Sequence, residues 1–199
     1  AHSGRSIVWP PSERGWDNSF QGLDRERIES TFANYLEEKF GGPEGIPEGT
    51  VIILDMEHPV HPRMFREYMY DRELFSSIID AFKLRIDVAR EALPDHPLAL
   101  YGVVVPHTRG MDSDTRAAYV AAGELGLYDD IDYLVPVLYH RWGEDDSDRA
   151  DRSDALVHQA LSESAALHRT DGSGLPLFAL INLTVANGNS LNHGDVALP

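Results

Sequence analysis

The stretch Thr50-Val-Ile-Ile-Leu-Asp-Met-Glu-His58 decides the predicted fold, because it is an apolar run that ends in two carboxylates. The apolar part is short and rich in β-branched residues, which is typical of a parallel strand buried on both faces. Side chains alternate along a strand, so Asp55 and Glu57 are expected to point the same way, roughly 6–7 Å apart. Pro59 cannot donate to the ladder and ends the predicted strand. The two acids are therefore expected at the carboxyl edge of a sheet, where α/β proteins build active sites.

Other strands and helices alternate with this strand along the chain. Short apolar runs bounded by Pro or Gly predict further strands at 6–9, 98–105, 132–139 and 176–182. Apolar residues at helical spacing predict helices at 25–40, 64–93, 114–125 and 151–169. Asp24 is expected to cap the first helix, and Gly41 and Gly42 are expected to end it. We interpret the acidic stretch 143–154 as an exposed loop entering a helix, and residues 171–174 as a turn.

The alternation of strands and helices predicts the α/β class with a parallel sheet and right-handed crossovers. Five strands cannot close an eight-stranded barrel, so an open doubly wound sheet and an incomplete (β/α)8 barrel both fit the pattern. No glycine-rich nucleotide loop follows any predicted strand, which argues against the nucleotide-binding open folds. We therefore expect one TIM-barrel-like domain over residues 1–199, partial in its strand number and possibly a fragment of a longer barrel.

The composition excludes several functional classes. The 199 residues carry a formal net charge of −16, and the resulting field repels phosphate, so we expect neither a nucleic-acid nor a membrane partner. No apolar run approaches the roughly 20 residues that span a bilayer. The absence of cysteine excludes disulfides, thiolate metal ligands and cysteine nucleophiles. The chain begins at Ala1 rather than Met, as a mature form after signal removal or a fragment would, and we expect a soluble, secreted or periplasmic protein.

Polar and aromatic side chains follow the end of each predicted strand, and these ends converge on one mouth in a parallel barrel. The candidate site residues are Trp9, Asp55, Glu57, His58, His107, Arg109, Tyr139, His140, Trp142 and Asn182. Aromatic rings stack on sugar faces, and paired carboxylates perform acid/base chemistry at a glycosidic oxygen. The pattern therefore favours a carbohydrate partner.

The stretch Val51–Glu57 resembles the catalytic strand of chitinase-like and hyaluronidase-like glycoside hydrolases, in which a D-x-E pair ends a barrel strand. The stretches 98–106, 133–139 and 175–179 resemble the strands that follow in hyaluronidases, in the same order. The resemblance covers roughly residues 50–182 at the level of pattern, and by this alignment the chain begins near the third barrel strand. The longer chitinase signature D-x-x-D-x-D-x-E and the cysteines of animal hyaluronidases are absent.

This resemblance implies hydrolysis of a polysaccharide that contains N-acetylhexosamine. Glu57 would be the general acid, and Asp55 would orient the substrate's 2-acetamido group, whose carbonyl oxygen attacks the anomeric carbon. Tyr139 would hydrogen-bond the same group, and the other candidate residues would bind substrate. The route needs no second protein nucleophile, since the acetamido group takes that role, and we expect no metal and no cofactor. Burial and an adjacent like charge would keep one carboxyl protonated, as a general acid requires.

Two alternatives remain open from the sequence. A metal-dependent hydrolase could use the ligand types that cluster after the strands, namely Asp55, Glu57, His58, His61, His107 and His140. A non-catalytic carbohydrate-binding or assembly protein on a degenerate barrel is the other alternative. A five-stranded sheet exposes two edges, which a partner chain or a missing barrel segment would cover.

Overall fold

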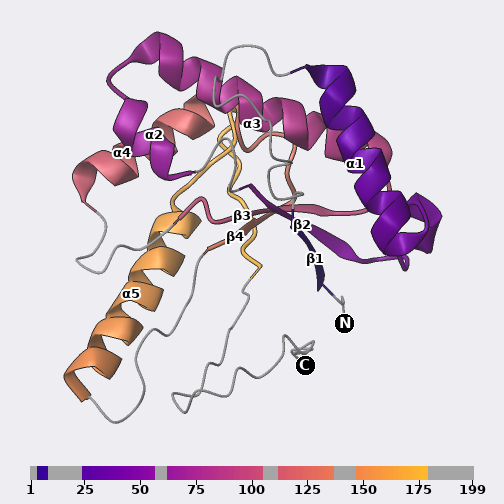
Figure 1. The fold of residues 1–199 in the computed structure, drawn as a ribbon. Helices are drawn as coiled ribbons and strands as arrows, with labels where there is room; N and C mark the ends of the chain where they lie inside the picture. The colour runs from indigo at the N-terminus through magenta and orange to yellow at the C-terminus, as the bar shows by residue number, and fades with distance from the viewer. Residues whose placement is uncertain (1–3, 9–23, 57–61, 105–111, 137–146, 179–199) are drawn as a thin grey trace.

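The computed structural model describes residues 4–8, 24–56, 62–104, 112–136 and 147–178 (Figure 1). Its elements are, in chain order, β1 (Gly4–Val8), α1 (Arg25–Phe40), the 3-10 helix η1 (Pro43–Gly45), β2 (Val51–Asp55), α2 (Arg63–Tyr68), α3 (Arg72–Ala92), β3 (Leu98–Tyr101), α4 (Ser113–Glu124), β4 (Tyr133–Val135) and α5 (Ser147–Ala165). The strands form one sheet in the order β1-β2-β3-β4, with every pair parallel. The predicted α/β class with a parallel sheet is confirmed.

The last residues of the four strands lie in one row across the sheet. Val8 pairs with Asp55, Asp55 pairs with Tyr101, and Tyr101 pairs with Val135. Because all four strands run in the same direction, this row is the carboxyl end of the sheet as far as the structure describes it. We call it the carboxyl-edge row.

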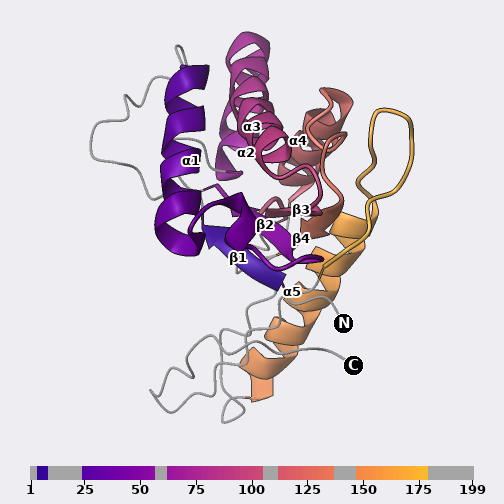
Figure 2. The ribbon, with the colours of Figure 1, turned by 90° about the vertical axis from the view of Figure 1, so that its right-hand side faces the viewer.

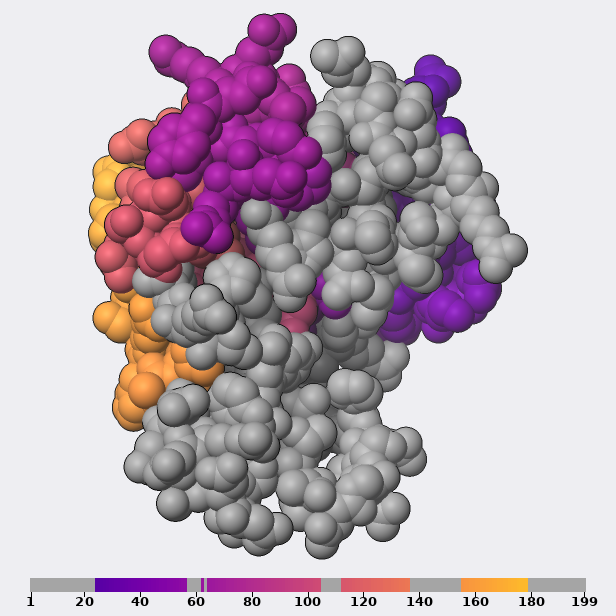
Figure 3. All heavy atoms as spheres, turned by 60° about the vertical axis from the view of Figure 1, so that its left-hand side comes forward, coloured from indigo at the N-terminus to yellow at the C-terminus, as the bar shows by residue number. Residues whose placement is uncertain are grey.

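The two faces of the sheet pack into two separate clusters. Ile52, Leu54, Leu98, Leu100 and Leu134 join buried residues of all five α-helices in the larger cluster. The smaller cluster lies on the opposite face, called the second face here, and contains Val51, Ile53, Ala99 and Val135 with Tyr101, Tyr133 and Phe178 against it. No described helix contributes to the smaller cluster. Helices α1, α3 and α4 accordingly lie together on one side of the strands (Figure 2), and α3, α4 and α5 follow one another on the outside of the molecule (Figure 3).

Helix α1 confirms the predicted local signals. Asp24 has an extended backbone, and its side chain accepts a hydrogen bond from the Glu26 amide. Gly41 adopts a left-handed conformation with φ of 72°, and its amide donates to the carbonyl of Glu37. A helix begins at a side-chain acceptor and ends at a residue that tolerates positive φ, so both boundaries follow from local chemistry.

The helical region predicted at 64–93 consists of two helices, because the chain breaks between α2 and α3. Asp71 has an extended backbone, with φ of −100° and ψ of 93°, and its carboxylate accepts a hydrogen bond from the Leu74 amide at 3.1 Å. An aspartate that satisfies a free amide in this way starts a new helix. The periodicity of the apolar residues on either side of the break conceals this cap.

The last helix and the shorter strands also differ from the prediction. Helix α5 begins at Ser147, within the acidic stretch interpreted as a loop, and ends at Ala165 rather than at 169. The strand predicted at 98–105 ends at Tyr101, because Gly102 has φ of 77° and turns the chain. Of the strand predicted at 176–182, the described residues form an isolated parallel bridge between Leu134 and Leu177, beside β4. The segments 137–139 and 179–182 of the predicted strands lie outside the described residues.

None of the helices that the structure describes has the length and apolarity of a membrane span.

Candidate functional site at the carboxyl edge of the sheet

Asp55 is the last residue of β2 and belongs to the carboxyl-edge row. Residues 51–54 before it are buried, whereas Asp55 is half-buried. Its neighbours Leu54 and Met56 belong to the larger cluster on the helix side of the sheet. Side chains alternate along a strand, so Asp55 faces the second face with Val51 and Ile53. The residues of β2 are therefore buried as far as Leu54, and Asp55 is the first residue of the strand that is partly exposed.

Tyr101 lies beside Asp55 in the same row and packs on the same face. The pair beneath them, Ile53 and Ala99, is 1% and 0% exposed. Val135 follows Tyr101 in the row, on β4. From Asp55 to Val135, the carboxyl-edge row thus presents a carboxylate, a phenol and an apolar side chain, above an apolar layer.

Tyr101 is not among the residues predicted from the sequence. It lies inside the apolar run 98–105, which predicts a buried strand position and not a strand end. The signal that could have identified it is Gly102, because a glycine inside a strand pattern often marks the place where the strand stops.

Asp55 is the one predicted site residue that the structure describes, and the others lie outside the described residues. These are Trp9, Glu57, His58, His107, Arg109, Tyr139, His140, Trp142 and Asn182. The same holds for the metal alternative, of whose members only Asp55 is described. Within the described ranges, no group of three or more His, Asp or Glu side chains could hold a metal ion.

A buried cation, Arg85, lies in α3 on the helix side of the sheet and not on the face of Asp55. Its side chain is 0% exposed, and Nη1 donates to the carbonyl oxygen of Ala81 at 2.8 Å. Burial lowers the pKa of Arg85 to about 10, so the guanidinium keeps its charge at neutral pH. Arg85 belongs to the helical layer, and we assign it no part in the chemistry of Asp55.

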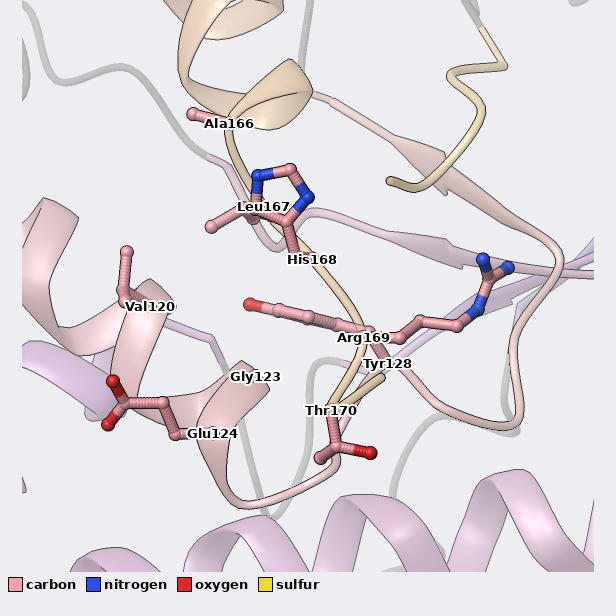
Figure 4. Close-up of a pocket in the computed structure, with 9 residues that line it drawn as sticks. All are labelled: Val120, Gly123, Glu124, Tyr128, Ala166, Leu167, His168, Arg169 and Thr170. Carbon is pink, nitrogen blue, oxygen red and sulfur yellow. The ribbon is translucent and has the colours of Figure 1, made fainter. Parts of the chain in front are cut away.

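A pocket of about 300 Å³ lies away from the carboxyl-edge row (Figure 4). It is lined by the carboxyl end of α4, by Tyr128 and by segment 166–170 after α5. Helix α4 connects the carboxyl end of β3 to the amino end of β4, so its last residues lie at the opposite edge of the sheet. The Arg169 guanidinium extends away from the pocket and donates to the carbonyl of Ile131 at 2.9 Å. The pocket is therefore not continuous with the position of Asp55.

No family model, curated protein or solved structure shows a significant match to this chain.

Proposed function

We propose that the sheet is part of a (β/α)8-type barrel. The strand order is consecutive, with no reversal. A doubly wound sheet reverses its order and carries helices on both faces, whereas a barrel winds in one direction and carries them on the outside. The one-sided helices and the apolar second face of this sheet fit the barrel arrangement. On this proposal the second face is the barrel interior and the carboxyl-edge row lies at the barrel mouth.

The proposed function is that of a glycoside hydrolase acting on a polysaccharide that contains N-acetylhexosamine. The observation that carries it is the position of Asp55, half-buried at the carboxyl end of a buried parallel strand and beside a tyrosine. Enzymes on parallel barrels carry their catalytic residues at this end of the strands. Glu57 follows Asp55 by two residues in the sequence, the spacing of an acid pair on one face of a strand.

The proposed mechanism uses the substrate's own acetamido group as the nucleophile. Asp55 accepts a hydrogen bond from the acetamido N–H and orients the group, while the Tyr139 hydroxyl forms a hydrogen bond to the same group. The acetamido carbonyl oxygen forms a bond to the anomeric carbon as the glycosidic C–O bond breaks, and Glu57 donates its proton to the leaving oxygen. The Glu57 carboxylate then takes a proton from the water that opens the cyclic intermediate, which restores the acid.

The test is turnover and binding of chitin and hyaluronan oligosaccharides by the wild type, Glu57→Gln and Asp55→Asn. Glutamine has the shape of glutamic acid without its proton, so Glu57→Gln is expected to lower turnover by a factor on the order of 10²–10⁴ and to retain binding. Asp55→Asn is expected to lower turnover. It is also expected to alter the titration of Glu57, because the two carboxyls are coupled, and so to shift the alkaline limb of the pH profile, where the general acid loses its proton.

Glu44→Gln is the matched control, since Glu44 is an exposed acid in η1. Its turnover is expected to equal that of the wild type. Wild-type turnover in Glu57→Gln would refute the assignment of the general acid. Binding without any turnover in the wild type would instead support a carbohydrate-binding protein on a degenerate barrel.

A further inference from the structure

The carboxyl-edge row holds a second functional candidate, Tyr101. It is the last residue of β3 and the partner of Asp55 in the strand register. Neighbouring strands lie roughly 4.8 Å apart, so a group bound at the Asp55 carboxylate also meets the ring of Tyr101. The ring is half-buried, whereas Ala99, two residues earlier on the same face, is 0% exposed. Tyr101 is thus the first side chain of β3 on this face that a ligand could reach.

From Asp55 to Val135, the chemistry of the row changes from polar to apolar. The Asp55 carboxylate accepts hydrogen bonds, the Tyr101 ring is apolar on its faces with a polar tip, and Val135 is a buried aliphatic side chain. A ligand group suited to this row carries an N–H donor and a small apolar end close together. The acetamido group of an N-acetylhexosamine has both, whereas the free amine of a deacetylated sugar lacks the apolar end.

We propose that Tyr101 is a substrate-contacting residue that determines specificity for the N-acetylated sugar. Its ring forms the apolar wall next to Asp55 and contacts the acetamido methyl while Asp55 accepts the N–H. This inference rests on the proposed function and adds a residue and a selectivity to it. Removal of a fitted apolar contact of this size lowers the preference for the acetylated over the deacetylated sugar by about 10–200-fold.

Tyr133 offers a matched control on the same face. It pairs with Ala99, one layer below the row, and its ring makes an edge-to-face contact with Phe178 at 6.1 Å between centroids. Tyr133 is also half-buried, so both tyrosines share residue type, face and burial. They differ in strand and in distance from the carboxyl edge, since Tyr101 ends β3 and Tyr133 begins β4.

The experiment measures dissociation constants in the Glu57→Gln background, for a chitin oligosaccharide and for its deacetylated counterpart. Adding Tyr101→Ala is expected to weaken binding of the acetylated oligosaccharide by about 10–100-fold and that of the deacetylated one by less than about 3-fold. Tyr101→Phe keeps the ring and is expected to retain both affinities. Tyr133→Ala is expected to leave the ratio of the two constants unchanged. If thermal unfolding shows that Tyr101→Ala does not fold, Tyr101→Val replaces it, because valine has a higher strand propensity than alanine.

The outcomes separate this inference from the function on which it rests. If Glu57→Gln binds the acetylated oligosaccharide and Tyr101→Ala binds it with unchanged affinity and ratio, the role of Tyr101 is refuted while the proposed function stands. If the alanine variants at Tyr101 and Tyr133 lower the ratio equally, the effect is structural and the role is also refuted. If Glu57→Gln binds no chitin or hyaluronan oligosaccharide, both proposals are refuted.

Discussion

Gly102 sets the end of β3 through its backbone conformation. Its φ is 77°, and apart from its own atoms and those of its chain neighbours, no atom of the described residues lies within 4 Å of the position that a Cβ would occupy. Its amide donates to the carbonyl of Val135 at 3.1 Å. An L-residue in the left-handed region costs about 1–2 kcal/mol, so Gly102→Ala is expected to lower the free energy of unfolding by that amount. Urea unfolding measures the loss.

Gly172 is the control for this prediction, because it has φ of 80° and equally open space, in the turn after α5. Gly172→Ala should lose a similar free energy of unfolding without changing oligosaccharide binding. An unchanged stability of Gly102→Ala would show that the conformation at the end of β3 is not strained for alanine.

The buried phenol of Tyr128 makes the free energy of unfolding depend on pH in the alkaline range. Its hydroxyl is buried and donates to the carbonyl of Tyr119 at 2.9 Å, and burial raises the pKa of the phenol well above its ordinary value. The folded protein therefore keeps this proton when the unfolded chain releases it near pH 10. Above that pH the folded state binds more protons than the unfolded one, so the free energy of unfolding falls by up to about 1.4 kcal/mol per pH unit.

Tyr128→Phe tests this linkage by removing the titrating group. The variant is expected to lose about 0.5–1.5 kcal/mol at pH 7, from the missing hydrogen bond. It should then lose less stability than the wild type between pH 10 and pH 11. Urea unfolding at pH 7, 10 and 11 gives both quantities, and equal slopes for the two proteins would contradict the assignment.

At the scale of elements, Asp132 ties α3 to the amino ends of two strands. Its carboxylate oxygen Oδ2 accepts from Arg90 Nη2 at 2.7 Å and from the Leu98 amide at 2.8 Å. Arg90 Nη2 also donates to the carbonyl of Asp130. Hydrogen bonds to charged groups contribute about 1.5–3 kcal/mol, so Asp132→Ala is expected to destabilise the fold by about 2–3 kcal/mol.

Asp132→Asn separates the two bonds, since an amide oxygen can still accept from the Leu98 amide but carries no charge for Arg90. Its loss is expected to be smaller, about 1 kcal/mol. Chemical denaturation of both variants measures the difference. If Asp132→Ala is as stable as Asp132→Asn, the hydrogen bond from the Leu98 amide does not contribute to stability.

At the scale of the whole molecule, the net charge of −16 acts against the compact state. Raising NaCl from about 10 mM to about 1 M shortens the screening length from about 30 Å to about 3 Å. We therefore expect the melting temperature to rise, by about 2–4 °C for each 1 kcal/mol of repulsion removed. The gain should vanish near pH 4.8, the sequence pI, and a salt-independent melting temperature at pH 7 would contradict the prediction.

Local signals in the sequence determined much of the architecture. The cap at Asp24, the glycine at 41 and the apolar spacing between them fixed α1, because capping and amphipathic periodicity depend on residues within a few positions. The alternation of strands with helices likewise determined the parallel sheet. The same periodicity missed the break at Asp71, because apolar residues continue at helical spacing on both sides of it.

The tertiary structure alone decided which side chains stand beside Asp55. The sequence placed Asp55 at a strand end, since an apolar run and the proline that follows it are local features. It did not place Tyr101 in the same row, because the register between two strands is set by how both pack against α3 and each other, and the two residues are 46 positions apart in the chain. Strand pairing is a non-local interaction, and a shift by one residue would have turned Tyr101 to the helix side.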